Sequence, residues 1–505
     1  MQTTNKLGIV VLSAFCILHS AFAVRGATGD TRLIDAVKSG NAAAVQNLLK
    51  QKGLVNEAES DGSTALHWAA RLDRLDLVQA LIRSGAQANV KNRYAITPLT
   101  LAAVNGSAPV VDALLKAGAD PNSTDADGQT VLMLSARTGK PEAVKLLLEG
   151  GAQVNARETW QGETALMWAA AEDHPETVAL LASRGADLNV RSKLLEYPKV
   201  KVDAATMVFT ALPRGGLTAL MLAARQGALG GIRALAEAGA DLNATDADGT
   251  TALVIAVINA HYDAAALLIE KSADLNIGDA AGMTPLYAAI DMQHQEPMIN
   301  RPLPKPSGRL LPLDVVTMLL DRGANPNVRL KAPLLMRQHS GGDPSLGEGA
   351  TPLMRAAKVS DTRVIGMLLD KGADPNLGLR NQTTALMIAA SRAARNAGPE
   401  QQTIDAMQLL ISKGADVNAV NDNGESALHI AVPRGDGLVR FLAEHGADLN
   451  LKDKAGRTPL DVAMGVAGSG GGGRGRGGRG GPPAAGQVRE STAALLKELM
   501  ASRGQ

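Results

Sequence analysis

The sequence predicts an all-α solenoid, in which short helix-turn-helix units stack in a line and small β-hairpin fingers connect them. Three observations predict this fold. A pattern of about 33 residues recurs along nearly the whole chain, each copy has apolar residues at helical spacing on two short segments, and each copy ends in turn-forming residues. The chain of 505 residues is also longer than one hydrophobic core usually serves, which favours a repeat array.

The period is measured from a threonine or serine that opens each copy. These residues are Thr64, Thr97, Thr130, Thr164, Thr218, Thr251, Thr284, Thr351, Thr384, Ser426 and Thr458. Five of the ten intervals between them are 33 residues, one is 34 and one is 32, and the three longer intervals equal one repeat plus an insertion. The sequence therefore predicts 11 repeat units, each of which contacts mainly its neighbours.

The copy that begins at Thr97 shows how one unit should fold. The Thr97 hydroxyl can cap free helix amides, and Pro98 suits the first helical position. Two short helices follow from the apolar spacing of Leu99, Ala102 and Ala103, and then of Val110, Val111, Leu114 and Leu115. Gly118 falls where a left-handed, helix-ending residue is expected, and residues 122–128 supply the turn chemistry of a finger. Helices this short are marginal alone, so stacking must stabilise them.

These copies resemble the ankyrin repeat, which has a 33-residue period and the pattern Thr-Pro-Leu-His-x-Ala. The clearest matches are Thr64 to Ala70, Thr284 to Leu286 and Ser426 to Ala431. The resemblance covers about residues 30–500, and it implies a side-chain hydrogen bond between the opening threonine and the histidine. Five copies have methionine instead of this histidine, so packing must hold them without that bond: Met133, Met167, Met221, Met354 and Met387.

The organisation of the chain follows from where the period is kept and where it is interrupted. A stacked scaffold tolerates additions only in its loops, and its terminal units need a solvated outer face. In chain order the sequence predicts a signal peptide (1–23), an N-terminal capping helix pair (24–60), repeats 1–4 (61–189), a finger-side insertion (190–215), repeats 5–7 (216–327) with a helix–helix insertion (292–312), a loop insertion (328–348), repeats 8–10 and the start of repeat 11 (349–464), a Gly/Arg-rich flexible loop (465–488) and a C-terminal capping helix (489–505).

The first 23 residues have the features of a secretory signal peptide. Lys6 is the only charge before residue 25, an apolar run extends from Leu7 to Leu18, and a small-x-small triplet ends at Ala23. The run is shorter than the roughly 20 residues that cross a bilayer. We therefore expect cleavage after Ala23 and an exported mature chain, periplasmic or secreted, without a transmembrane segment. Cys16 is the only cysteine, so this cleavage would leave no disulfide and no catalytic thiol.

Composition and motifs argue against an enzyme. The net charge is +1, and only 11 residues are aromatic, which is few for a deep aromatic-lined pocket. No H-E-x-x-H, G-x-S-x-G, Walker A or paired-cysteine motif is present. Two Asp-x-Asp-Gly runs, at 125–128 and 246–249, resemble part of a calcium loop, but the closing glutamate is replaced by Leu134 and Ile255. We expect turns there, and no catalytic residue, metal or cofactor.

Four aromatic residues define the predicted partner-binding surface. Tyr94 and Trp160 fall at or near finger tips, where the repeat requires no aromatic ring, and Tyr197 and Phe209 lie in the first finger-side insertion. Together they would line one stretch of the finger-side groove across repeats two to five. The expected function is a non-catalytic scaffold, expected to be a monomer, that binds a protein or extended peptide on its concave face of fingers and inner helices.

Trp68 and Trp168 differ from these four aromatic residues. Each replaces a core aliphatic residue on the first helix of its unit, so buried packing is favoured there.

Three alternatives remain open at this point. The first is an enzyme whose site lies in the insertions. The second is nucleic-acid contact through residues 465–481, which hold 11 glycines with Arg474, Arg476 and Arg479. Because no aromatic residue is interleaved and the chain is nearly neutral, a flexible linker is favoured and a nucleic-acid partner is disfavoured. The third is a passive structural spacer.

Overall fold

A computed structural model of the chain describes residues 30–195, 215–294, 304–332, 346–391, 400–466 and 488–503, and in these residues it forms 24 α-helices and no β-strand. The helices alternate between an inner and an outer row. The inner helices are α1 (Arg32–Lys38), α3 (Ala65–Arg71), α5 (Pro98–Asn105), α7 (Val131–Ala136), α9 (Ala165–Ala171), α11 (Ala219–Gln226), α13 (Ala252–Ile258), α15 (Pro285–Gln293), α17 (Pro352–Val359), α19 (Ala385–Ala390), α21 (Ala427–Ala431) and α23 (Pro459–Ala463). The outer helices are α2 (Ala42–Leu48), α4 (Leu75–Arg83), α6 (Ala108–Lys116), α8 (Pro141–Glu149), α10 (Pro175–Ser183), α12 (Leu229–Glu237), α14 (Tyr262–Glu270), α16 (Pro312–Asp321), α18 (Thr362–Asp370), α20 (Glu400–Ser412), α22 (Asp436–Glu444) and α24 (Glu490–Arg503).

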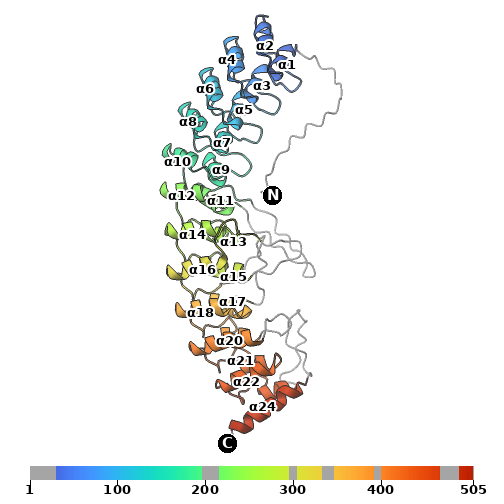
Figure 1. Cartoon of the computed structure of the whole chain (residues 1–505), viewed down its shortest axis with the longest axis vertical. Helices are drawn as coiled ribbons and strands as arrows, with labels where there is room; N and C mark the ends of the chain where they lie inside the picture. The colour runs from blue at the N-terminus through green and yellow to red at the C-terminus, as the bar shows by residue number, and fades with distance from the viewer. Residues whose placement is uncertain are drawn as a thin grey trace.

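The helix pairs stack into a curved column (Figure 1). The outer helices lie on its convex left side, and the inner helices and the fingers lie on its concave right side. Each inner helix packs on the next inner helix along the column, and the outer row is built in the same way. The predicted all-α solenoid is therefore confirmed.

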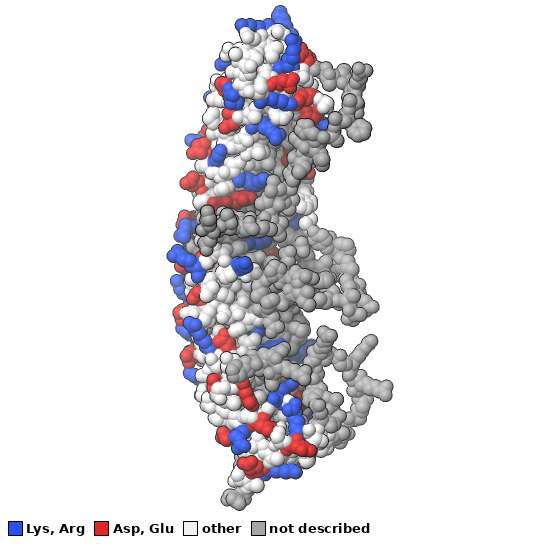
Figure 2. All heavy atoms as spheres, turned by 45° about the vertical axis from the view of Figure 1, so that its right-hand side comes forward, with Lys and Arg blue, Asp and Glu red and all other residues white. Residues whose placement is uncertain are grey.

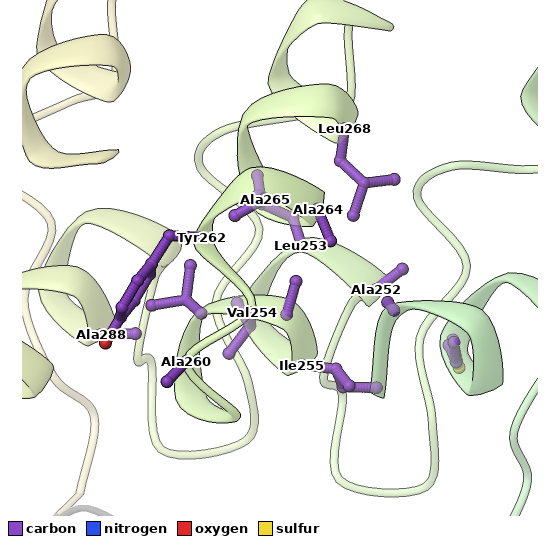
Figure 3. Packing of buried hydrophobic residues seen from close by; sticks show 14 of the residues in the cluster. Ala252, Leu253, Val254, Ile255, Ala260, Tyr262, Ala264, Ala265, Leu268 and Ala288 are labelled. Atoms are coloured by element: carbon purple, nitrogen blue, oxygen red, sulfur yellow. The ribbon is translucent and has the colours of Figure 1, made fainter. Parts of the chain in front are cut away.

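The core is a continuous apolar layer between the two rows of helices. Figure 3 shows one segment of it, where Leu253 and Val254 of α13 meet Ala264, Ala265 and Leu268 of α14 in one cluster. Alanines let neighbouring backbones approach closely, and the aliphatic side chains between them are excluded from water. The stack is therefore held by packing between neighbours.

The opening threonine caps the inner helix whether or not a histidine follows it. In repeat 1, His67 Nδ1 lies 2.9 Å from Thr64 Oγ1, and its Nε2 lies 3.0 Å from the Ile96 carbonyl of the next finger. His429 makes the same two kinds of contact. In a methionine repeat the cap is kept, because the backbone N–H of Met133 still donates to the opening threonine, 3.2 Å away. The methionine repeats lack both contacts of the imidazole ring, the one to the opening hydroxyl and the one to the next finger.

These histidines should make stability depend on pH. Burial lowers the pKa of His67 and of His429 below the ordinary value of 6.5, so near that pH the unfolded chain binds more protons than the folded one. The two histidines therefore cost no stability above pH 6.5, and the free energy of unfolding falls as the pH drops below 6.5. We expect the double variant His67→Met and His429→Met to show a shallower loss between pH 7.5 and pH 5, measured from urea midpoints.

The variant and the natural chain are compared by how much their free energy of unfolding changes with pH. Their absolute stabilities are not compared, because methionine also changes the packing at neutral pH. Burial also lowers the pKa of His261, which stays in the variant and leaves part of the slope. If the double variant loses stability with pH as steeply as the natural chain, His67 and His429 do not cause this pH dependence.

Asparagines at the finger bases join each unit to the next. The side chain of Asn89 donates to the Gly118 carbonyl (2.7 Å) and accepts from the Asp120 N–H (2.7 Å). The same acceptor bond crosses the first insertion, where Asn189 accepts from the Asp241 N–H at 2.9 Å. Such asparagines recur along the column as Asn56, Asn89, Asn122, Asn155, Asn189, Asn243, Asn276, Asn327, Asn376 and Asn418. The insertions therefore leave the stacking register intact.

The fingers are turns with little strand pairing. In the described residues four of them close with a single antiparallel bridge, such as Thr124 with Thr130, and none forms a longer strand. The calcium-like run is a turn, since Asp125 Oδ1 accepts from the N–H groups of Asp127 (3.0 Å) and Gln129 (2.9 Å). Each carboxylate or amide at this position fixes the path of its own finger.

Parts of the insertions lie within the described residues. Residues 304–311 return along the start of α14, where the Asp263 carboxylate accepts from the N–H groups of Arg309 (2.8 Å) and Leu310 (3.2 Å). Most of the Gly/Arg-rich loop and of the first finger-side insertion lies outside the described residues. Among the helices of the described segments, none has both the length and the apolar character needed to cross a membrane.

Candidate protein-interaction surface

In all the repeats except the one that contains α17, which has Arg355 there, the middle of the inner helix carries an apolar residue at the same position. In repeats 1 to 4 these residues are Trp68, Leu101, Leu134 and Trp168, and we call them the apolar row. All four are half-buried and pack against the core on one side. Their other side faces the concavity, so an incoming partner would meet a band of apolar surface.

Trp68 is held in place by polar contacts from both sides. Its indole N–H donates to the Glu59 carboxylate at 2.7 Å, and Glu59 also pairs with Lys38. The ammonium group of Lys38 lies 4.2 Å from the ring centroid, and the guanidinium of Arg71 lies 5.4 Å from it. The sequence favoured a buried Trp68; the ring is half-buried, because its outer side is covered by cations instead of by the stack.

Trp168 repeats this arrangement three units further along. Its indole N–H donates to Glu163 at 2.9 Å, and the guanidinium of Arg137, from the preceding unit, lies 5.5 Å from the ring. Burial raises the pKa of Glu163, which shows that this carboxylate is partly withdrawn from water. Trp168 is likewise half-buried, so the expectation of buried packing is corrected for both tryptophans.

The finger of repeat 4 is built to display Trp160. The interval of 34 residues before Thr164 adds one residue to this finger, and a glutamate stands where most other fingers have aspartate or asparagine. The buried carboxylate of Glu158 accepts from the N–H groups of Trp160 (2.6 Å), Gln161 (2.7 Å) and Glu163 (2.9 Å). Trp160 is 68% exposed, the largest value for a large apolar side chain in the described residues. The turn is thus rigid and the indole ring is free to be contacted.

The finger of repeat 2 displays Tyr94 in a similar way. Asn92 Oδ1 accepts from the N–H groups of Tyr94 and Ile96, both at 3.0 Å, and the Tyr94 side chain is 41% exposed. The guanidinium of Arg93 lies 5.2 Å from the ring.

The other two residues of the predicted contact surface cannot be placed in this way. Tyr197 and Phe209 lie outside the described residues, so Tyr94 and Trp160 are the two members that the structure places, on fingers two units apart.

Charge is mixed on this side of the column. Figure 2, in which the concave side turns forward, shows Lys and Arg interspersed with Asp and Glu, and neither sign forms a continuous band. Within the described segments no group of three or more His, Cys, Asp or Glu side chains is placed to hold a metal ion. One open depression lies on the convex face between α4 and α6, next to Leu75, Ile82 and Ala113.

These features define a class: a repeat column that offers extended surface for contact with another macromolecule. A family profile described as "Ankyrin repeats (3 copies)" matches residues 12–92, 33–125, 99–192, 220–299 and 391–467. A profile described as "Ankyrin repeat" matches residues 281–331 and 348–378. The chain belongs to the ankyrin repeat family. Ankyrin repeats are generally scaffolds for protein–protein interaction and are typically non-catalytic.

Similar proteins share short stretches of this chain. A stretch of 80 residues is 42% identical to the B-cell lymphoma 3 protein homolog of Mus musculus, over 16% of this chain and 18% of that protein. A stretch of 96 residues is 38% identical to the Neurogenic locus Notch protein of Drosophila melanogaster, over 17% of this chain and 4% of that protein. A stretch of 72 residues is 40% identical to Delta-latroinsectotoxin-Lt1a of Latrodectus tredecimguttatus, over 14% and 6%. The chain therefore spans less than a fifth of the length of these relatives.

Proposed function

We propose that this chain is a non-catalytic scaffold that binds a protein or an extended peptide on its concave face. Trp160 is the observation that most supports this role. A rigid, largely exposed tryptophan on a finger lengthened by one residue has no packing role in the stack, and tryptophan is the residue type most enriched among binding hot spots. Tyr94 and the apolar row supply further contact area on the same side.

The rigidity of the stack supports binding energetically. A preformed surface loses little conformational freedom when a partner docks, so more of the contact energy appears as affinity. A stable interface needs on the order of 800 Å² from each partner. Three or four adjacent units, such as those from Tyr94 to Trp160, can provide an extended surface of that order.

Substitution of the two displayed aromatic residues tests the proposal. A partner captured from the native source with the mature chain should bind the variants Trp160→Ala and Tyr94→Ala at least about tenfold more weakly, since each hot spot typically contributes 1–2 kcal/mol or more. Isothermal titration with the purified partner measures the change. Leu229→Ala is the matched control, because Leu229 is an exposed apolar residue on outer helix α12.

Far-ultraviolet circular dichroism verifies that each variant is folded. Unchanged affinity in folded variants would contradict the proposal and would favour the passive spacer. Turnover of a small molecule without a macromolecular partner would favour the enzyme.

We also propose that the chain is exported. Lys6, the apolar run from Leu7 to Leu18 and the triplet ending at Ala23 support this proposal. Expression of the full chain in a Gram-negative host, followed by fractionation and N-terminal sequencing, tests it. A mature protein that begins at Val24 in the periplasm or medium is the expected result, and an unprocessed chain confined to the cytoplasm would contradict export.

A further inference from the structure

The carboxyl ends of the inner helices alternate between a cation and an apolar residue. The position seven residues after the opening threonine faces the concavity, and in repeats 1 to 6 it is occupied by Arg71, Val104, Arg137, Ala171, Arg225 and Ile258. The three arginines and Val104 are exposed, and Ala171 and Ile258 are half-buried. We call this set the alternating row. It lies beside the apolar row, one turn further along each inner helix.

The backbone that carries two of these arginines is fixed by the next unit. The Arg137 carbonyl lies 3.0 Å from His174 Nε2, and the Arg225 carbonyl lies 2.9 Å from His261 Nε2. Each histidine begins an outer helix of the following repeat. The guanidinium groups therefore project from points that the stack holds at constant spacing.

The arginines of the alternating row are not held in close ion pairs by the scaffold. In the described part of the chain, none of Arg71, Arg137 and Arg225 forms an ion pair with a carboxylate, and the first two lie over tryptophan rings. Glu59 and Glu163 accept the indole N–H groups, and Glu163 also attracts Arg225 electrostatically. This leaves Arg71 and Arg137 as the two stronger sites for an added carboxylate. A cation at the end of a helix gains a little from the helix dipole, but that gain does not explain why every second unit has one.

The distance between the arginines of the alternating row predicts how far apart the charges of a bound ligand should lie. Successive inner helices pack directly on one another, and packed helices lie about 8–10 Å apart. Cations in every second unit are then about 16–20 Å apart, which a chain in the polyproline II conformation spans in about six residues at about 3.1 Å each, with every third residue on the same side. An apolar residue of the row lies midway between them.

We propose that the alternating row binds an extended acidic peptide, in the polyproline II conformation, whose carboxylates recur about every six residues with an apolar residue midway between them. The peptide would cross the inner helices of repeats 1 to 6, with its carboxylates on Arg71, Arg137 and Arg225 and its apolar side chains on Val104 and the apolar row. Arginine and carboxylate form the strongest ordinary hydrogen-bonded ion pairs. This proposal rests on the proposed function and names the chemistry of its partner.

A single-stranded nucleic acid fits the row less well. It carries a phosphate on every nucleotide, so most of its charges would lie against apolar side chains, and the chain as a whole is nearly neutral. Nucleic-acid binding is therefore one outcome of the test that would overturn the proposal.

Synthetic peptides test the spacing directly. One 15-residue peptide carries glutamates about six residues apart with a leucine midway between them, and a second has the same composition with its glutamates clustered. Titration is followed by tryptophan fluorescence and by calorimetry with the mature chain. We expect the spaced peptide to bind at least about tenfold more tightly than the clustered one, with affinity that decreases as salt is added. Equal affinity, no binding at millimolar peptide, or tighter binding of a 15-nucleotide oligothymidine would overturn the proposal.

Charge variants assign the effect to the alternating row. Arg71→Glu and Arg137→Glu should each weaken the spaced peptide at least about tenfold, and the milder Arg137→Gln should weaken it less while keeping the shape of the residue. Arg83→Glu, on outer helix α4, is the control and should change nothing. If Trp160→Ala loses a natural partner while both arginine reversals keep it, the scaffold function stands and the acidic-peptide proposal fails.

Discussion

Replacing Arg355 with leucine is expected to lower the free energy of unfolding by about 3–5 kcal/mol. Arg355 Nε lies 2.7 Å from Asp291 Oδ1, and both side chains are only 8% exposed. The pair joins α17 to α15 across the 67-residue interval that contains two insertions. The buried Asp291 carboxylate would lose a cation held at 2.7 Å and could not replace it with water without opening the stack, so the penalty is large.

A double variant separates this charge effect from lost packing. Repeat 2 has Val104 and Leu101 at the positions of Asp291 and Arg355. The combination Asp291→Val with Arg355→Leu should therefore recover stability to within about 1 kcal/mol of the natural chain, because apolar residues can replace a buried ion pair. Urea unfolding monitored by circular dichroism gives both values. If the single variant is as stable as the natural chain, the Asp291–Arg355 pair does not stabilise the contact between α15 and α17.

Replacing Glu158 with alanine is expected to lower stability by about 2–3 kcal/mol and to release the finger that carries Trp160. The substitution leaves three backbone N–H groups without their acceptor, and a buried donor without a partner costs about 1–3 kcal/mol. The loss should be local, so amide hydrogen exchange at Trp160, Gln161 and Glu163 is the measurement. We expect faster exchange there, with little change in α5 and α6.

Glu158→Gln is the matched control for this substitution. Its amide keeps one acceptor oxygen for the N–H groups of Gln161 and Glu163, but it cannot accept from the Trp160 N–H with the second terminal atom. We expect an intermediate exchange rate. If alanine and glutamine both leave the amides protected, the finger is held by contacts other than this carboxylate.

The sequence predicted the fold well because the repeat period determines it almost completely. Each unit supplies its own cap, its own two helices and its own turn, and all of these are local signals that a single sequence contains. The opening threonines cap as expected, and the left-handed glycine expected at position 118 has φ of 83°. The fingers were predicted as β-hairpins and have at most one bridge in the described residues, because their aspartates satisfy the turn amides in place of a strand ladder.

The functional surface was only partly predictable. Tyr94 and Trp160 were identified as departures from the repeat, and the structure places both side chains exposed on fingers; their role in binding stays a prediction. The half-buried state of Trp68 and Trp168 depends on cations and carboxylates from other segments, which no local pattern shows.

The Asp291–Arg355 pair was missed although its members were visible in the sequence. Arg355 stands where the other repeats have an apolar residue, and Asp291 is the one acidic residue at a position where other repeats have a cation or an uncharged residue. Two such departures of opposite sign in adjacent repeats are a signal that could have found the pair.

The asparagine bonds at the finger bases also bear on how the chain reaches its folded state. Ordinary units are joined by asparagine bonds between residues 30 to 32 apart in sequence, whereas the bonds across the insertions join residues 40 to 52 apart. Loop-closure entropy grows only with the logarithm of length, so the longer separation adds about 0.5 kcal/mol. Folding that nucleates anywhere in the column should therefore pass the insertions with little delay, and assembly speed should reflect nearest-neighbour contacts and not total chain length.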